Sequence, residues 1–263
     1  MYTIVLATQK GGSGKSTLAI GLAVAARGAG HNVRLIETDK QGTLSNWQAR
    51  RGLAEPIVEA VYNAGDIERR LQALERGGVT LTVIDTASGT NAATTAAIRY
   101  SDLCIIPARP SVADIEAMVP TLAVARAWRT PFAFVLNQTP IRGGHRVNDA
   151  SSVLDERAPR DLAEVLAQPF IVMRNDHQDA LAAGLAVSEY APSGKSAVEM
   201  RELWQWIDNR LHGSTVAQDE TASEFREEPF RFVFAETSAR PTAPAVPPPS
   251  VWRDIDPSWD ACL

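Results

Sequence analysis

The fold is decided near the start of the chain, where the apolar run Thr3-Ile4-Val5-Leu6-Ala7 is soon followed by Lys10-Gly11-Gly12-Ser13-Gly14-Lys15-Ser16-Thr17. A β-strand that ends in glycines lets successive backbone N–H groups point at a polyphosphate, and a helix that begins there adds its positive end. The pattern predicts that helix from Ser16 to about Ala29. Strand, loop and helix in this order indicate a phosphate-binding loop; a glycine-rich turn with incidental lysines is the alternative.

The residue types in this loop match the chemistry of a nucleotide and its metal ion. Lys15 is placed to reach the β- and γ-phosphates, and the Ser16 hydroxyl to ligand Mg²⁺. Glycines matter because a side chain would block the approach of the backbone to the phosphates. We therefore predict a nucleotide-binding site made of Lys10, Gly11, Gly12, Ser13, Gly14, Lys15, Ser16 and Thr17.

A carboxylate further along the chain strengthens this prediction. Thr82-Val83-Ile84-Asp85-Thr86 is an apolar run that contains an aspartate at its end, which is the Walker B pattern. On a strand beside the first one, Asp85 would hold Mg²⁺ next to Ser16, directly or through water. An aspartate that only caps the turn after its strand would give the same sequence.

Apolar runs of strand length recur between helical patterns over residues 1–213. We expect strands at Thr3–Ala7, Val33–Glu37, Leu81–Asp85, Leu103–Pro107 and Phe132–Leu136, with Phe170–Met173 as a candidate for one more near the sheet edge. We expect helices at Ser16–Ala29, Asp66–Glu75, Asn91–Tyr100, Val112–Trp128, His177–Ala183 and Lys195–His212. This alternation predicts an α/β fold, with a mostly parallel, twisted sheet and helices on both faces.

The composition changes after about Gly213. Residues 214–263 contain nine acidic and four basic side chains, which account for the whole net charge of −5, and the proline-rich segment Pro241–Pro249. We therefore predict two parts, a P-loop domain over 1–213 and an acidic, disordered tail over 214–263. The tail either docks a partner through Trp252 or Trp259 or is a solvated extension without a role.

The two cysteines and the hydropathy pattern exclude several classes of protein. Cys104 and Cys262 have no metal-ligand spacing and form no disulfide framework, so Cys104 is expected to be a small buried hydrophobe. No apolar run reaches the length of about 18 residues that a membrane span needs. The chain also starts without the pattern of a signal peptide, so we expect a cytoplasmic protein without stable membrane insertion.

The phosphate-binding loop departs from the standard G-x-x-x-x-G-K-[ST] pattern, because Gln9 stands at the first glycine and a second lysine, Lys10, follows it. The form K-G-G-x-G-K-[ST] resembles the deviant Walker A loop of the ParA/MinD family of P-loop ATPases. In that family the first lysine reaches across a dimer interface to the nucleotide bound by the partner. The resemblance implies this catalytic role for Lys10 alongside Lys15, an ATP-dependent homodimer, and ATP with Mg²⁺ as cofactors.

Residues 37–41, with the sequence E-T-D-K-Q, resemble the D-x-D-P-Q segment of ParA-type ATPases. The second aspartate of that motif orients the attacking water, and the resemblance implies this role for Asp39. We also count Asp39 with Ser16 and Asp85 among the predicted metal-site residues. Glu37 and Lys40 replace the first aspartate and the proline, so we expect a less rigid loop. Asp39, Mg²⁺ and the two loop lysines would then support hydrolysis. The alternatives are an exposed loop carboxylate and a nucleotide-binding scaffold with little turnover.

The end of another strand bears on which base is bound. Guanine-specific P-loop proteins of the small GTPase type carry N-K-x-D there, whereas this chain has Asn137-Gln138-Thr139-Pro140. In the family resembled, an asparagine at this place contacts adenine, which implies that role for Asn137. A plain asparagine turn is the alternative.

Two further segments, Thr43–Trp47 and Ser101–Ser111, are similar to the compact plasmid-partition ATPases of the ParF kind, and the likeness covers roughly residues 1–212. In those relatives a P-x-x-P-S stretch forms part of a dimer or higher-order contact, and Pro107 and Pro110 match it. A turn between a strand and a helix would place the same prolines.

The resemblance implies a slow ATPase that acts as a dimerising switch and positions DNA or another cargo, with hydrolysis stimulated by a cargo-bound, ParB-like partner. Such proteins bind nucleoid DNA non-specifically as ATP-bound dimers, using basic residues toward the C-terminal helices. The candidates for these contacts are Arg142, Arg146, Arg174, Lys195, Arg201 and Arg210. A solvated helix face would look the same.

Two other predictions concern binding to a specific operator and binding to a membrane. The phosphate-binding loop begins at residue 10, so we expect no winged-helix extension ahead of it and no binding to a specific operator. A membrane switch of the MinD kind is the alternative class, but the acidic tail would be repelled by an anionic lipid surface.

Overall fold

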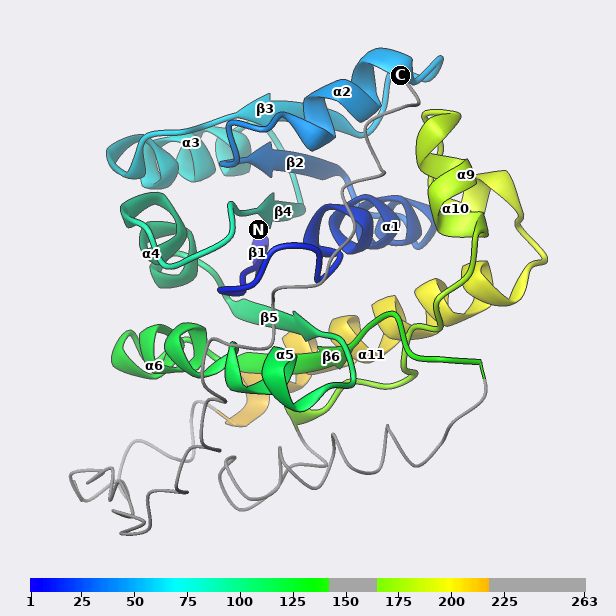
Figure 1. The fold of residues 1–263 in the computed structure, drawn as a ribbon. Helices are drawn as coiled ribbons and strands as arrows, with labels where there is room; N and C mark the ends of the chain where they lie inside the picture. Colours follow the sequence, from blue (N-terminus) through cyan, green and yellow to red (C-terminus); the bar gives the residue numbers. More distant parts are fainter. Residues whose placement is uncertain (142–164, 218–263) are drawn as a thin grey trace, which may run out of the picture. The chain divides into compact units, whose positions relative to one another are not determined.

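The structure, a computed structural model, describes residues 1–141 and 165–217 (Figure 1). Its strands are β1 (Tyr2–Leu6), β2 (Val33–Glu37), β3 (Ile57–Ala60), β4 (Leu81–Asp85), β5 (Leu103–Ala108) and β6 (Phe132–Leu136). Its helices are α1 (Lys15–Gly28), α2 (Thr43–Arg50), α3 (Ala64–Arg76), α4 (Ala92–Arg99), α5 (Val112–Glu116), α6 (Val119–Ala127), α9 (Asp176–Ala182), α10 (Val187–Tyr190) and α11 (Lys195–Ala217).

The strands form one parallel sheet in the order β3-β2-β4-β1-β5-β6. β1 lies between β4 and β5, so the chain fills one side of the sheet first and then the other. Ligands of such sheets bind outside the carboxyl ends of the strands, where the direction of filling reverses. Because all the strands are parallel, the ends of β1, β2, β4 and β6, which carry the predicted site, share one edge of the sheet.

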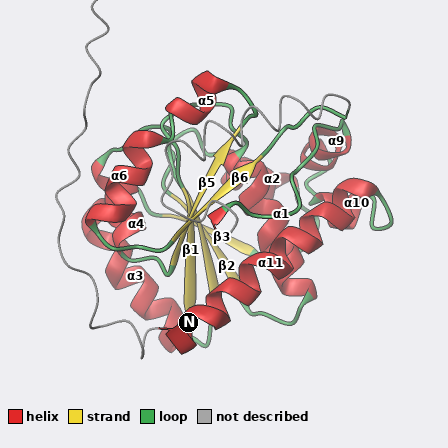
Figure 2. Cartoon of the chain, turned by 90° about the horizontal axis from the view of Figure 1, so that it is seen from below, coloured by secondary structure: helices red, strands yellow, loops and turns green. Residues whose placement is uncertain are grey.

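Alternate strand residues point into two separate cores on opposite faces of the sheet. Ile4 and Leu6 belong to one core, with apolar side chains of α1, α2, α10 and α11. Val5 and Ala7 belong to the other, with side chains of α3, α4, α5 and α6. Figure 2 shows α3, α4 and α6 on one side of the strands and α1 and α11 on the other. The predicted α/β fold with helices on both faces is confirmed.

Three short elements were not predicted from the sequence pattern. β3 has four residues, none of them fully buried, so it lacks the apolar run of the inner strands. α2 is short and mostly polar, with Leu44 and Trp47 as its buried residues. α10 is a single turn of four residues. Each is too short for its periodicity to be recognised.

Two predicted elements are wrong. The single helix expected over Val112–Trp128 is two helices, α5 and α6, because Pro120 in the first turn of α6 has no N–H to continue the ladder of α5. The strand expected over Phe170–Met173 is absent from the sheet. Val172 makes an isolated parallel bridge to Thr139 beyond the end of β6, and its N–H instead donates to Glu199 Oε2 at 3.1 Å.

The remaining expectations concern Cys104, the chain end and the membrane. Cys104 is buried in β5, as predicted, and burial raises the pKa of its thiol to about 12. α11 continues to Ala217, past the predicted helix end at His212, and the rest of the predicted tail lies outside the described residues. Among the residues that the structure describes, no helix combines the length and the apolar character needed to span a bilayer.

Candidate functional site

The loop between β1 and α1 turns on two glycines with positive φ. Gly12 has a φ of 76°, and Gly14, the residue that precedes α1, has a φ of 90°. A side chain at such angles is strained. A Cβ atom on Gly14 would also lie 2.2 Å from Asn137 Nδ2. Glycine is therefore required at position 14 for two reasons: its φ is positive, and Asn137, just after β6, lies too close for a side chain.

Lys15 is the first residue of α1, and its side chain is buried. Its Nζ lies 3.2 Å from Ser88 Oγ, in the loop that follows β4. Burial lowers the pKa of Lys15, whereas the nearby carboxylates of Asp85 and Asp39 raise it. The structure thus brings together the lysine of the phosphate loop and the two predicted carboxylates, which come from three separate elements.

Ser16 and Asp85 form the centre of the candidate metal site. Ser16 Oγ donates to Asp85 Oδ2 at 2.6 Å. Burial raises the pKa of the Asp85 carboxyl to about 7, while the Ser16 hydrogen bond and Lys15 act to lower it. Asp85 Oδ1 is buried without a hydrogen-bond partner among the described residues.

This donor set fits Mg²⁺. Buried polar atoms normally have a partner, so the free Asp85 Oδ1 indicates a ligand that the described residues do not supply. Mg²⁺ is usually held by one or two carboxylates, with water and phosphate oxygens completing its shell. The described part of the chain contains no cluster of three or more histidine, cysteine, aspartate or glutamate side chains that could hold a metal ion.

Asp39 lies in a tight turn between β2 and α2. Gly42 N donates to Asp39 O at 3.1 Å, and Gln41 N donates to Asp39 Oδ1 at 2.9 Å. Residues 39–42 therefore form a β-turn in which aspartate occupies the first position, as is common. Lys40 stands at the second position of the turn, and its side chain is exposed.

Glu37, which precedes this turn, faces α2 rather than solvent. Its buried carboxylate accepts hydrogen bonds from Leu44 N at 2.6 Å, from Ser45 N at 3.2 Å and from the Ser45 hydroxyl. Glu37 and Lys40 together predict a less rigid loop, and its rigidity stays a prediction. The Glu37 side chain ties the end of β2 to the first turn of α2.

Asn137 and Gln138 follow β6 and bind the phosphate loop through its carbonyl groups. Asn137 Nδ2 donates to Ser13 O at 2.8 Å, and Gln138 Nε2 donates to Gly12 O at 2.9 Å. Gln138 has a φ of 55°, which is uncommon for a residue other than glycine. Asn137 thus lies at the predicted nucleotide site, and its contact with adenine stays a prediction.

Lys10 is held by α5. Its Nζ lies 3.0 Å from Asp114 Oδ2, and Asp114 Oδ1 accepts from Arg109 Nε at 3.1 Å. The Ser111 hydroxyl also donates to this carboxylate. Burial acts to raise the pKa of Asp114, but the bonds from Ser111, Lys10 and Arg109 hold it below its usual value. The role of Lys10 across a dimer interface stays a prediction.

Three residues of the site were missed by sequence reasoning: Ser88, Gln138 and Asp114. The spacing of Ser111 and Asp114 is that of a capping box, and Ser111 does cap α5 by accepting from Asp114 N. This pattern could have identified Asp114. No sequence signal distinguishes Ser88 or Gln138 from other loop residues.

The basic residues proposed to contact DNA differ in the contacts that their side chains make within the chain. Arg174 makes a bidentate pair with Glu199, with both distances 2.7 Å, and Arg201 donates to the Pro192 carbonyl. Arg210 lies over the Trp206 ring, and Lys195 is exposed. Arg142 and Arg146 lie outside the described residues.

Comparison with known proteins identifies the family of this domain. A family model described as the CobQ/CobB/MinD/ParA nucleotide binding domain matches residues 4–224. The chain is 30% identical over 206 residues to "Maintenance of carboxysome distribution protein A" of Gloeobacter kilaueensis, which covers 77% of this chain and 90% of that protein.

Two solved structures share the fold. The septum site-determining protein MinD of Pyrococcus horikoshii, complexed with Mg-ADP, gives a TM-score of 0.60 at 17% identity, over 80% of this chain and 96% of that one. A Cyanothece McdA variant in complex with ATP gives a TM-score of 0.59 at 16% identity, over 81% and 96%. The family match spans most of the sequence, and the matched region contains the whole candidate site. The chain therefore belongs to the CobQ/CobB/MinD/ParA nucleotide-binding family.

Proposed function

We propose that this protein is an ATP-dependent dimerising switch of the ParA type, which positions DNA or a protein assembly and hydrolyses ATP slowly. The observation that carries the proposal is the separation of the two loop lysines. Lys15 is buried beside Asp85 and Asp39, whereas Lys10 is partly exposed and bound to α5. These positions support a role for Lys15 at the chain's own nucleotide and a role for Lys10 at the nucleotide of a second copy.

The chemistry follows from the groups in the site. The Lys15 ammonium, together with the N–H groups at the start of α1, would bind the phosphates. Ser16 and Asp85 would hold Mg²⁺, which supplies positive charge where negative charge develops on the phosphates. Asp39 would orient the attacking water by accepting a hydrogen bond from it, and Lys10 of a second copy would add charge from across the interface.

The partners we propose are a second copy of the chain, a cargo-bound adaptor of the ParB kind and non-specific DNA. An adaptor that inserts an arginine near the phosphates would stimulate hydrolysis. The carboxysome distribution protein of Gloeobacter supports a protein assembly as one class of cargo. We propose a cytoplasmic protein that is retained on the nucleoid when ATP is bound.

The test measures the mass of the protein and its binding to non-specific duplex DNA with ATP, ADP or no nucleotide, at two salt concentrations. ATP-dependent dimers whose DNA affinity falls with salt are the expected result. Dimers that form without binding DNA would contradict DNA as the partner and would indicate a protein or membrane surface instead.

Two variants connect the result to the site. Lys15→Ala should abolish ATP binding, and retained affinity would contradict the phosphate-loop assignment. Lys10→Ala should bind ATP without dimerising, and a normal ATP-bound dimer would contradict the cross-subunit role. Arg76→Ala is the matched control, because Arg76 is an exposed cation at the end of α3, away from the carboxyl ends of the strands.

A further inference from the structure

We propose that Glu37 is a positioning residue, which sets the geometry of the turn that carries Asp39 by fixing the start of α2. The inference rests on the proposed function, since the aim of Asp39 matters only if ATP is hydrolysed. Glu37 makes no hydrogen bond to the phosphate loop or to Ser16 among the bonds described above, and its charge acts to raise the pKa of Asp85, its partner on the neighbouring strand.

The bonds of Glu37 close the loop at its far end. Its carboxylate accepts from the N–H groups of Leu44 and Ser45 and from the Ser45 hydroxyl. These groups belong to the first turn of α2, whose preceding residue, Gly42, offers no side-chain cap. A carboxylate at this place satisfies free N–H groups and faces the positive end of the helix. Glu37 therefore serves as a cap supplied from a strand.

The near end of the loop is fixed to the metal site. Thr38 N donates to Asp85 O at 2.9 Å, and the Thr38 hydroxyl donates to the same carbonyl at 3.3 Å. Glu37 and Asp85 are also direct partners in the β2–β4 register. The turn that carries Asp39 is thus held between the backbone of Asp85 and the first turn of α2.

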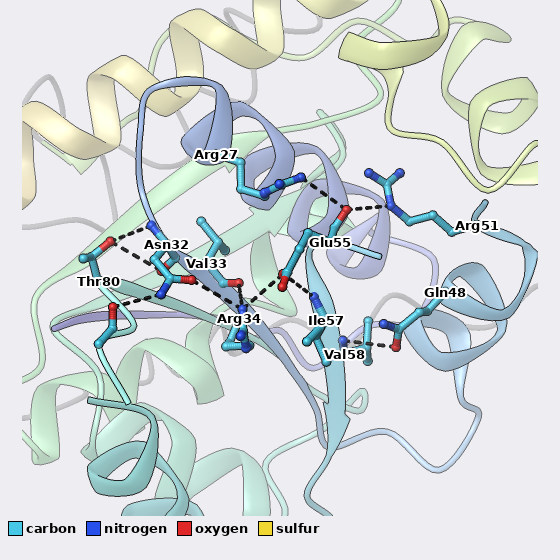
Figure 3. A network of polar contacts seen from close by, with 11 residues as sticks. Arg27, Asn32, Val33, Arg34, Gln48, Arg51, Glu55, Ile57, Val58 and Thr80 are labelled. Atoms are coloured by element: carbon cyan, nitrogen blue, oxygen red, sulfur yellow. Dashed lines mark hydrogen bonds and ion pairs between the residues drawn. The ribbon is translucent and has the colours of Figure 1, made fainter. Parts of the chain in front are cut away.

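Residues at the other end of α2 form hydrogen bonds with other elements, so the position of the helix does not depend on Glu37 alone. Arg51, just after α2, binds Glu189 through two bonds of 2.7 and 2.6 Å, and Trp47 Nε1 donates to Leu185 O at 3.2 Å. Figure 3 shows Arg51 bonded to Glu55 and Gln48 bonded to Val58. Because α2 is held there without Glu37, the Glu37 carboxylate controls the turn rather than the helix as a whole.

The sequence of the turn explains why such a device is needed. Lys40 occupies the second position of the β-turn, where proline is favoured because its ring fixes φ. A lysine leaves this angle free. The bonds of Glu37 restrict the turn from outside and so replace the restriction that a proline would supply from within.

The test compares Glu37→Gln with the wild-type chain in ATP turnover, ATP affinity and hydrogen exchange of the amides of residues 38–45. Glutamine has the same length but offers one acceptor oxygen and an NH₂ group that cannot accept. We expect kcat to fall roughly ten- to a hundredfold, as small misplacements of reacting groups do. KM for ATP should be unchanged, and the Leu44 and Ser45 amides should exchange faster.

Asp102→Asn is the matched control. Asp102 Oδ2 also accepts a backbone hydrogen bond, from Thr3 N at 2.7 Å, but it lies before β5, at the opposite edge of the sheet. We expect this variant to keep the wild-type kcat and the wild-type exchange of residues 38–45. An equal loss of kcat in both variants would show a general effect of stability and would overturn the proposal.

Three further variants test the same role of Glu37. Glu37→Gln added to Asp39→Ala should cause no further loss of kcat, because the proposal assigns the action of Glu37 to the turn. Ser45→Ala keeps the Glu37 charge and so separates the turn from the effect of that charge on Asp85. Lys40→Pro should restore part of the turnover that Glu37→Gln removes. Ser45→Ala, which removes a single bond to Glu37, tests the role if Glu37→Gln does not fold, and should lower kcat at constant KM. Unchanged kcat in Glu37→Gln or in Ser45→Ala, or an additive loss with Asp39→Ala, would overturn the proposal.

Failure of the proposed function gives a different result. A wild-type chain that binds ATP but has no turnover would contradict the ATPase. The exchange of the Leu44 and Ser45 amides would still report whether Glu37 holds the turn. Wild-type exchange in Glu37→Gln would overturn the positioning role by itself.

Discussion

The Lys10 ammonium and the Asp114 carboxylate form an ion pair of 3.0 Å between the phosphate loop and α5, in which Asp114 is 5% exposed and Lys10 37%. The lysine that distinguishes this loop from the standard P-loop is thus bound within its own chain. If Lys10 serves the nucleotide of a second copy, this pair must open when the dimer forms. Asp114 then competes with the dimer for Lys10.

Replacing Asp114 with Asn should therefore favour the ATP-bound dimer. Lys10 is partly exposed, so we expect each pair to contribute roughly 0.2–1 kcal/mol. A dimer opens one pair in each copy, so the dimer association constant should rise by about two- to thirtyfold. Mass measurements over a range of protein concentrations with ATP would detect this change. Asp66→Asn, which removes the exposed pair with Arg69 on α3, should leave dimerisation unchanged. A weaker or unaltered dimer in Asp114→Asn would show that Asp114 does not restrain Lys10.

The buried Asp85 should make the stability of the metal-free protein depend on pH. Its carboxyl has a pKa of about 7 in the fold, against an ordinary value of 3.8. Between these values the folded state binds a proton that the unfolded state does not, so the free energy of unfolding falls as pH rises. The decrease is at most about 1.4 kcal/mol per pH unit.

Denaturant unfolding of the metal- and nucleotide-free chain at several pH values from about 4 to 7 measures this slope. Asp85→Asn cannot ionise, so its stability should fall less steeply with rising pH than that of the wild type. Mg²⁺ with ATP should raise wild-type stability most at the upper end of the range, where the free carboxylate is available to the metal. Parallel slopes for the two proteins would contradict the assignment of the titration to Asp85.

Much of the fold was predictable because its signals are local. The strands β1, β2, β4, β5 and β6 are apolar runs in the sequence. Gly14 and Lys15 stand at the start of the helix that follows the first of them. The parallel sheet then requires that Asp39, Asp85 and Asn137 share the edge at which Lys15 lies. β3 and α2 escaped prediction because they are held by tertiary bonds, such as that from Val58 N to Gln48 Oε1 at 3.1 Å, rather than by periodicity.

The finer features of the site depend on contacts between distant segments. Asp114 meets Lys10 across 104 positions of the chain, and Asn137 meets Ser13 across 124. No local pattern indicates such a pair. The bonds of Glu37 were not predicted for a different reason: the glutamate is visible in the sequence, but the N–H groups of Leu44 and Ser45 that it reaches are not.

Gly14 should tolerate no side chain. Gly14→Ala would strain a residue with a φ of 90° and place its Cβ 2.2 Å from Asn137 Nδ2, so the phosphate loop must move. We expect ATP affinity to fall by at least about tenfold, which corresponds to about 1.4 kcal/mol. Isothermal titration with ATP and Mg²⁺ measures this loss.

The control for this variant is Gly28→Ala, in the last turn of the same helix. A Cβ on Gly28 has nothing within 4 Å. Alanine there should leave ATP affinity unchanged and stabilise the fold by up to about 1 kcal/mol. In Gly14→Ala combined with Asn137→Ala the close contact is gone but the strain in φ remains, so only part of the affinity should return. Full affinity in Gly14→Ala alone would mean that the loop does not need this geometry.

Glu189 should matter more for stability than for nucleotide binding. The Arg51 side chain is fully buried and pairs with Glu189 through two short bonds, while its guanidinium also lies 4.8 Å from the centre of the Trp47 ring. Removing one partner of a buried pair leaves a charge without compensation, which costs about 3–5 kcal/mol. Arg51 keeps its bonds to the carbonyls of Glu55 and Gly184, so we expect Glu189→Gln to lie near the lower end of that range. Denaturant unfolding measures this cost. ATP affinity should be unchanged because the Glu189 carboxylate is bonded to Arg51 and to Ala186 N rather than to the phosphate loop. A loss of less than about 0.5 kcal/mol, typical of a surface substitution, would show that the pair does not hold α2 to α10.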